Sequence, residues 1–214
     1  MLAPMLNIPE DIYTEPEDFS PDTLANLGPL RPLAGEWRSD AGVDVSPKAE
    51  GPERRVYIEH IRMEPIDPQP NGPQLLYGLR YHIHVNTAEE DITFHDQVGY
   101  WLWEPATGAL MQTFSIPRGQ AGMAVGNAAA DAKAFRLQAV RGSTVNGIVS
   151  NPFLEYGFRT ESYTITVTIN ADGTWSYELD TVLIVPNLKE PFHHTDRNTL
   201  RKIGEPTLNP TARA

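Results

Sequence analysis

The sequence predicts an all-β protein, folded as a single antiparallel up-and-down β-barrel of about ten strands with a short helix near its N-terminus. Apolar and polar residues alternate along many short segments, and turn residues separate most segments from the next. Successive antiparallel strands must close on themselves or form two sheets, because unpaired edges are a liability. A barrel of about ten strands is too wide for its own side chains to fill, so the sequence also predicts an internal ligand cavity.

The N-terminal part predicts an irregular arm and then a short helix. Residues 1–20 are rich in Pro, Asp and Glu and show no clear period. The stretch SPDTLANLG predicts a short helix, with Ser20 as the N-cap, Pro21 at the first helical position and Gly28 at the end. We expect the barrel domain over residues 21–205 and a C-terminal tail over residues 206–214.

Most of the remaining chain predicts strands. The segment SYTITVTI has period two, and with the turn NADG and the segment TWSYELDTVLIV it predicts a hairpin over residues 162–185. FHDQVGYWLWEPATGALMQTFSI predicts a second hairpin, and QLLYGLRYHIHV predicts a strand with one apolar and one polar face. Further strands are expected at residues 33–39, 54–63, 121–127, 133–141 and 192–203.

Composition excludes several classes of function. The 214 residues include 17 Lys+Arg and 28 Asp+Glu, giving a net charge of −11, and basic residues do not cluster. We therefore expect no binding to nucleic acid or to an anionic membrane. The chain has no cysteine, which excludes disulfides, thiolate metal sites and cysteine nucleophiles. Without an N-terminal signal pattern or an apolar run of membrane-span length, we expect a soluble cytoplasmic protein.

His82 and His84 form the first candidate site. Alternate residues of a strand point the same way, so these two imidazoles could chelate a metal, with Glu89 as a third ligand in a cupin-like arrangement. The simpler interpretation, two polar residues on one face of a strand, is favoured.

Aromatic residues and one arginine form the next candidates. FHDQVGYWLWE could supply a flat apolar wall for a planar or acyl ligand, although a role in the core is the favoured interpretation. Arg118 follows a strand in SIPRGQ, where it is either a solvated turn residue or a clamp for a carboxylate at the barrel mouth.

The last candidate is PFHHTDRNTLRKI, in which His193 and His194 are adjacent on the predicted final strand. A neutral imidazole is a common axial ligand of haem iron. Consecutive strand residues point to opposite faces, so only one of the two histidines can face a given pocket.

Several segments together resemble the bacterial fatty-acid-binding-protein-like β-barrel family, which is related to the nitrobindins and shares their haem-binding domain. The segments are LRPLAGEWRSDAGVDVSP, YGLRYH, FHDQVGYWLWEPATG, MQTFSIPRGQ, SNPF and PFHHTDRNTLRKI. The resemblance extends from Leu30 to Ile203 and implies a ten-stranded antiparallel barrel of calycin type. Gly35 and Trp37 match the first half of the Gly-x-Trp-x-Gly motif of nitrobindins, so the resemblance implies that both residues contribute to the cofactor site.

The resemblance also implies a function. Nitrobindins bind haem b through a histidine near the start of the last strand, and they are associated with nitric oxide chemistry and peroxynitrite isomerisation. His194 is the expected ligand of the haem iron and His193 the substitute; a one-residue β-bulge in the last strand would bring His194 to the ligand position. Asp196 or Asn198 is expected to hydrogen-bond the other imidazole nitrogen.

Two other functions stay open. The barrel could be a non-catalytic carrier of a fatty acid or another small apolar ligand, whose carboxylate would meet Arg118 or Arg80. A cupin-like metal enzyme using His82 and His84 ranks last. A homodimer is compatible with each of these functions.

Overall fold

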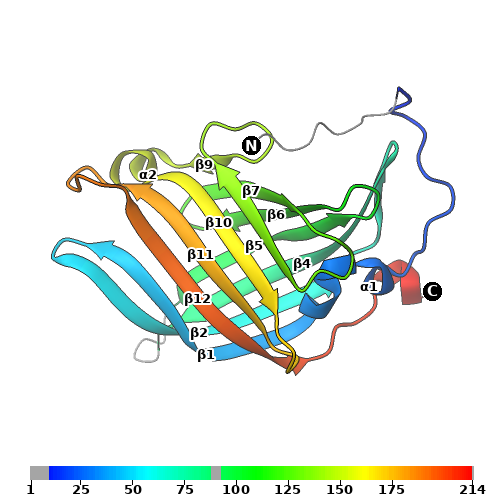
Figure 1. Cartoon of the computed structure of the whole chain (residues 1–214), viewed down its shortest axis with the longest axis horizontal. Helices are drawn as coiled ribbons and strands as arrows, with labels where there is room; N and C mark the ends of the chain where they lie inside the picture. Colours follow the sequence, from blue (N-terminus) through cyan, green and yellow to red (C-terminus); the bar gives the residue numbers. More distant parts are fainter. Residues whose placement is uncertain (1–9, 88–92, 214) are drawn as a thin grey trace.

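Ten antiparallel strands form a closed barrel in the computed structural model of the chain, which describes residues 10–87 and 93–213 (Figure 1). The strands of the ring are β1 (Gly35–Lys48), β2 (Gly51–Pro65), β4 (Gln74–Asn86), β5 (Thr93–Glu104), β6 (Ala109–Ile116), β7 (Gln120–Asn127), β8 (Ala134–Val140), β10 (Arg159–Ile169), β11 (Trp175–Ile184) and β12 (Phe192–Gly204). Each strand pairs with the next, β12 pairs with β1, and two short strands, β3 (Gln69–Asn71) and β9 (Ile148–Ser150), add to β4 and β7. The predicted all-β up-and-down barrel is confirmed.

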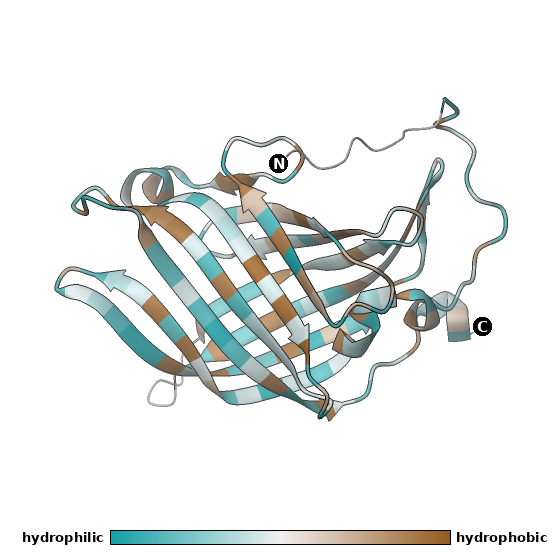
Figure 2. Ribbon diagram, in the orientation of Figure 1, coloured by the Kyte–Doolittle hydropathy of each residue, from teal (hydrophilic) through white to brown (hydrophobic). Residues whose placement is uncertain are grey.

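The side chains of the barrel wall alternate between the lumen and the outside. In β10, Tyr163, Ile165 and Val167 are buried, whereas Thr164 and Thr166 between them are partly exposed. The strands therefore appear as alternating bands of apolar and polar residues (Figure 2). This is the period of two that the sequence contains, because successive strand residues point to opposite faces.

A short helical segment closes one end of the barrel. It consists of α1 (Thr23–Asn26) and the 3-10 helix η1 (Gly28–Leu33), beside the closed end in Figure 1. The prediction of Ser20 as N-cap is wrong: Asp22 caps α1 and accepts a hydrogen bond from the backbone N–H of Ala25 (3.0 Å). Because the cap is Asp22 and not Ser20, α1 begins later than predicted and is a single turn. The chain then continues directly as η1.

Leucines of this segment fill the closed end. Leu27, Leu30 and Leu33 are fully buried, and the indole N–H of Trp37 donates to the carbonyl oxygen of Leu33 (2.7 Å). The C-terminal tail packs against the same end, because the amide of Asn209 accepts from the backbone N–H of Thr23 (3.1 Å) and donates to the carbonyl oxygen of Pro21 (2.8 Å). The 3-10 helix η2 (Pro210–Arg213) follows.

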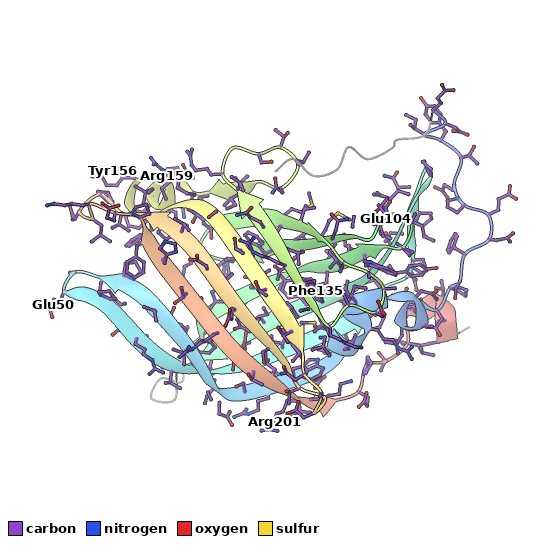
Figure 3. All side chains as sticks on the ribbon, in the orientation of Figure 1. Glu50, Glu104, Phe135, Tyr156, Arg159 and Arg201 are labelled. Atoms are coloured by element: carbon purple, nitrogen blue, oxygen red, sulfur yellow. The ribbon has the colours of Figure 1, made fainter. Side chains whose placement is uncertain are left out.

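The helix α2 (Pro152–Gly157) lies at the opposite end of the barrel. It contains Tyr156, which is labelled in Figure 3. The side chain of Asn151 caps this helix by accepting from the backbone N–H groups of Phe153 and Leu154. Leu154 points into the barrel, whereas Tyr156 is exposed on its outside.

A β-bulge interrupts β1. Ser39 pairs with Glu59 of β2 and Gly42 pairs with Tyr57, so two residues of β1 lie opposite Ile58 alone. The pairing of β1 with β12 contains the same irregularity. An extra residue reverses the inward and outward positions that follow it. The second half of β1 therefore faces the lumen with the residues that a regular strand would turn outward.

Among residues 10–87 and 93–213, no helix is long and apolar enough to cross a membrane.

Candidate functional site

The barrel encloses a cavity of about 410 Å³. It extends from Trp101 and Trp175, near the closed end, to Lys48 and Leu154 near α2. The apolar part of its wall includes Ile61, Met63, Ile83, Val85, Phe94, Phe114, Ile116, Phe158, Ile165, Leu179 and Leu183. The polar part includes Asp44, Tyr57, Glu59, His95, Gln97, Gln112, Arg118, Gln120, Thr160, Tyr163, Tyr177, Thr181, His194 and Asp196. The lumen is thus a mixed surface with a dense set of titratable groups.

The adjacent histidines of β12 point to opposite sides of the barrel wall, as expected. His194 lines the cavity, and its Nε2 lies 2.7 Å from Oδ1 of Asp44. His193 lies on the outer surface, where its Nδ1 is 2.9 Å from both carboxylate oxygens of Asp180. Each imidazole therefore has a carboxylate partner, but only His194 can reach a ligand in the lumen.

The predicted bulge in the last strand is not found beside His194; the irregularity of β12 against β1 lies farther on, at Ile203. The pairing of β12 with β11 is regular from Phe192 to Leu200, and the inward residues follow strict alternation as His194, Asp196, Asn198 and Leu200. The bulge lies in β1 instead, where it turns Asp44 into the lumen opposite Asp196. The inward position of His194 thus follows from regular alternation along β12, and the bulge in β1 supplies its partner Asp44.

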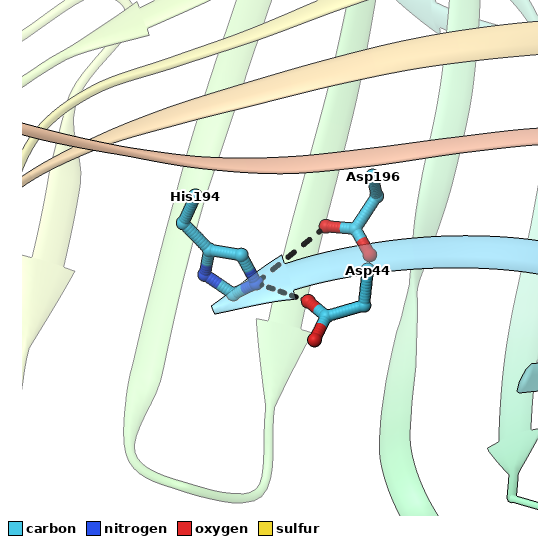
Figure 4. Close-up of side chains that lie close together, drawn as sticks. All are labelled: Asp44, His194 and Asp196. Atoms are coloured by element: carbon cyan, nitrogen blue, oxygen red, sulfur yellow. Dashed lines mark hydrogen bonds and ion pairs between the residues drawn. The ribbon is translucent and has the colours of Figure 1, made fainter. Parts of the chain in front are cut away.

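The prediction of Asp196 or Asn198 as the hydrogen-bond partner of His194 is also wrong. Oδ2 of Asp196 is 3.7 Å from Nε2 of His194, and Asn198 donates to Glu59 instead. Asp44, which is 2% exposed, makes the bond. Figure 4 shows Nε2 turned toward both carboxylates, with Nδ1 on the other side of the ring.

Burial and charge shift the pKa values of this group. Burial alone would lower the pKa of His194, but the hydrogen bond to Asp44 and the charges of Asp196 and Asp44 outweigh it, so that the pKa is raised. Burial raises the pKa of Asp196 to about 7; the charge of His194 opposes this shift and that of Asp44 adds to it. His194 and Asp196 therefore titrate as a coupled pair.

A second polar group lies deeper in the lumen, around Glu59. Tyr177 donates to this carboxylate (2.9 Å to Oε2), Asn198 donates to the same oxygen (2.7 Å), and the hydroxyl of Tyr57 is 2.8 Å from that of Tyr177. Burial raises the pKa of Glu59 to about 7 despite the two hydrogen bonds that favour its charged form. Glu59 is therefore a buried acid that changes its protonation near neutral pH.

Glutamines and tyrosines continue this polar layer around the barrel. Gln97 donates to the hydroxyl of Tyr81 (2.7 Å), and Tyr163 donates to Oε1 of Gln112 (3.0 Å). Burial raises the pKa of both phenols and lowers that of His95, so these groups are neutral near pH 7.

Arg118 is an exposed turn residue that also lines the cavity, so its place is compatible with both interpretations of the sequence. It follows β6 in the turn before β7, and its Nη2 donates to the carbonyl oxygen of Phe94 (2.8 Å). This bond holds the guanidinium of Arg118 against the backbone of β5.

Gly35 and Trp37, expected to contact a cofactor, lie at the closed end and do not line the cavity. Trp37 packs edge-on against Trp175, with ring centroids 6.1 Å apart. Gly35 has φ = 119°, and a Cβ there would lie 2.6 Å from the carbonyl oxygen of Gly204. Both positions thus support closure of the barrel between β1 and β12.

The outer wall holds the other candidates. His82 is exposed and His84 is half-buried, and they bond to Asp96 and Thr93, respectively, at 2.8 Å. Arg80 is exposed and paired with Glu64, so it is not the predicted lumen arginine. Glu89, the proposed third ligand of the cupin-like site, lies outside the described residues.

Sequence reasoning missed Asp44 and Glu59. The strand predicted at residues 33–39 ends before Asp44, because Gly42, Pro47 and several acidic residues suggest a loop. The alternation in Val43-Asp44-Val45 was an available signal, but without the bulge it would assign the valines to the lumen. Glu59 occupies an inward position of β2 where an apolar residue is the default expectation.

The chain is similar in sequence to one protein family and in fold to a solved structure. The chain matches one family model, described as a THAP4-like, heme-binding beta-barrel domain, over residues 26–202. No curated protein matches it significantly. Among solved structures it is similar to Rv2717c from M. tuberculosis, with a TM-score of 0.59 and 18% sequence identity over 87% of this chain and 99% of that one. At this identity the likeness to Rv2717c shows the fold alone.

Proposed function

Because the chain belongs to the THAP4-like haem-binding β-barrel family, as the resemblance to nitrobindins predicts, we propose that it binds haem b in the lumen with His194 as the axial ligand. The observation that carries this proposal is the orientation of the histidine pair: His194 lines the cavity, and His193 does not.

The donor set of the site fits a haem iron. An imidazole ligand commonly donates its second N–H to a carboxylate, which fixes the tautomer and makes the ligand nitrogen more basic. Asp44 is in position to accept such a bond from Nε2 of His194. The lone pair of Nδ1 is then available to the metal.

The cavity wall supports the proposal in a second way. A porphyrin needs flat apolar contacts on both faces. Phe94, Phe114, Leu179, Leu183 and Phe158 line the cavity from several strands and from the end of α2. Arg118, on the same wall, is suited to meet a haem propionate.

Bound haem would supply an iron with an open coordination position for a small ligand. Nitric oxide or peroxynitrite as that ligand, a peroxynitrite isomerase-like activity, the cytoplasmic location and a homodimer all stay predictions.

The alternative function, a fatty-acid carrier, receives less support from the lumen. A fatty-acid carboxylate would share the cavity with Asp44, Glu59 and Asp196. The cations on the cavity wall, Lys48 and Arg118, do not lie in the group of Asp44, Glu59 and Asp196: in the described part of the chain, neither forms an ion pair with these carboxylates. The repulsion between carboxylates in a poorly solvated space makes an acidic ligand costly to bind.

A hemin titration followed by absorption spectroscopy tests the proposal. We expect wild-type protein and His193→Ala to give a sharp Soret band that saturates at one hemin per chain, and His194→Ala to lack it. The absence of a saturable Soret band in the wild-type protein would refute haem binding. An equal band in His194→Ala would refute the assigned ligand.

A further inference from the structure

Three potential metal ligands meet on the lumen wall beside the open cavity. Asp44, His194 and Asp196 each offer one ligand atom, and these atoms all lie within 4.8 Å of one another (Figure 4). Asp44 of β1 pairs directly with Asp196 of β12, and His194 is two residues away on the same face of β12. The backbone of two paired strands thus holds all three side chains in place.

Ion pairs within the described part of the chain balance the charge of this group only in part. Like charges directly opposite each other destabilise a strand pair, and burial increases the cost. Among the ion pairs of residues 10–87 and 93–213, the two carboxylates have one cationic partner, the imidazole of His194. The group therefore carries a net negative charge whenever both aspartates are ionised.

Asp44 provides an independent indication of a ligand. Its side chain is 2% exposed, and within the described part of the chain its Oδ2 has no hydrogen-bond partner. A buried carboxylate oxygen without a donor is rare, because its desolvation is not compensated. A cation in the group would compensate this oxygen and the charge of both aspartates.

We propose that Asp44, His194 and Asp196 bind a divalent transition metal ion such as Zn²⁺, Fe²⁺ or Mn²⁺. Nε2 of His194 lies 2.7 Å from Oδ1 of Asp44 and 3.7 Å from Oδ2 of Asp196. Ligands that surround such a metal at ~2.0–2.2 Å stand ~3.0–3.5 Å from one another, so small side-chain rotations complete the site. An imidazole with two carboxylates selects these metals over Ca²⁺ and Mg²⁺. The cavity beside the group leaves further coordination positions open.

This site goes beyond haem binding and does not depend on it. A divalent ion and a haem iron would both bind the imidazole of His194, so the two ligands compete for this side chain. Asp196 separates the two functions, because it is 3.7 Å from His194 and makes no hydrogen bond to it. Replacing Asp196 therefore removes a metal ligand and leaves the His194–Asp44 bond in place.

Calorimetric titration of chelator-treated protein with Zn²⁺, together with the visible absorption of the Co²⁺ complex, tests the proposal. The variants are Asp196→Asn and Asp44→Asn, with Asp180→Asn as the matched control, because Asp180 pairs with His193 on the outer wall. Circular dichroism and thermal melting check that each variant is folded; if one is not, the other decides.

We expect one Zn²⁺ per wild-type chain and an affinity at least tenfold lower in both lumen variants, while Asp180→Asn binds like the wild-type protein. Zn²⁺ should also slow hemin uptake by wild-type protein but not by Asp196→Asn. The proposal is overturned if the wild-type protein binds no Zn²⁺, or if the folded lumen variants bind it unchanged, as they would if His82 and His84 were the ligands. If the Soret band is missing but Zn²⁺ binding is intact, the haem proposal is refuted and the metal proposal stands.

Discussion

His194 and Asp44 lie 150 positions apart in the sequence, yet their side chains meet at 2.7 Å across the pairing of β12 with β1. The contact depends on the bulge in β1, which turns Asp44 toward the lumen. The outer wall repeats the same chemistry in the pair of His193 and Asp180. Variants of the outer pair, His193 and Asp180, therefore serve as controls for variants of the lumen pair, His194 and Asp44.

Asp44→Asn should weaken hemin binding about 10–100-fold, the usual effect of losing the carboxylate that orients a metal-bound histidine. The amide keeps the shape of the side chain but removes the charge that makes the imidazole more basic. Dissociation constants from Soret titrations measure the effect, with Asp180→Asn expected to match the wild-type protein. Equal constants for the wild-type protein and Asp44→Asn would exclude Asp44 as a positioning residue for the ligand.

Trp37→Phe should lower stability without changing hemin affinity. The variant loses the hydrogen bond to Leu33 and part of the packing on Trp175, at a cost of about 1–3 kcal/mol. Urea denaturation gives the free energy of unfolding, and hemin titration of the folded variant gives the affinity. A large loss of affinity would restore Trp37 as a cofactor-binding residue, as the sequence motif predicts.

Gly42→Ala should destabilise the barrel by about 1–3 kcal/mol through overpacking. A Cβ at residue 42 would lie 2.2 Å from the ring of Tyr57, whose hydroxyl bonds to Tyr177. Gly157→Ala is the control, because the nearest atom to its Cβ would be at 3.6 Å. Thermal unfolding compares the two variants, and similar stabilities would show that Tyr57 can move without cost.

Glu59→Gln should change how stability depends on pH. The pKa of Glu59 is about 7 in the folded protein, above its ordinary value of 4.5, so the folded state binds more protons between these values. Stability contributed by this group is therefore lost as pH rises from 4.5 to 7. The glutamine variant avoids this loss, and its free energy of unfolding relative to wild type should increase by up to about 3 kcal/mol between pH 4.5 and pH 8.

Denaturation of the two proteins at several pH values measures this difference. Glu178→Gln, on the outward face of β11, serves as the exposed control and should follow the wild-type profile. Parallel profiles for Glu59→Gln and the wild-type protein would show that Glu59 titrates normally.

The sequence predicts most of the barrel because its signals are local. The hairpins at residues 162–185 and 94–116 follow from alternation and turn residues that lie close together in the chain. The same alternation correctly separates His193 from His194. The N-cap of α1, by contrast, is Asp22 and not the predicted Ser20. Both residue types favour this position, so the sequence does not decide between them.

The partners of His194 could not be predicted in this way. A β-bulge depends on the pairing of strands, and no local pattern marked the extra residue in β1. Alternation counted from Trp37 without the bulge would place Asp44 outside the barrel. The family resemblance led to the histidine, but the carboxylate that completes the site required the register of β1 against β12.

The most direct test of His194 as the haem ligand is chemical rescue of a variant that lacks its side chain. His194→Gly should bind hemin without the sharp Soret band of the wild-type protein, and millimolar imidazole should restore the band by entering the space left on the lumen wall. His193→Gly should show the wild-type band with or without imidazole. A wild-type band in His194→Gly before imidazole is added would contradict the account.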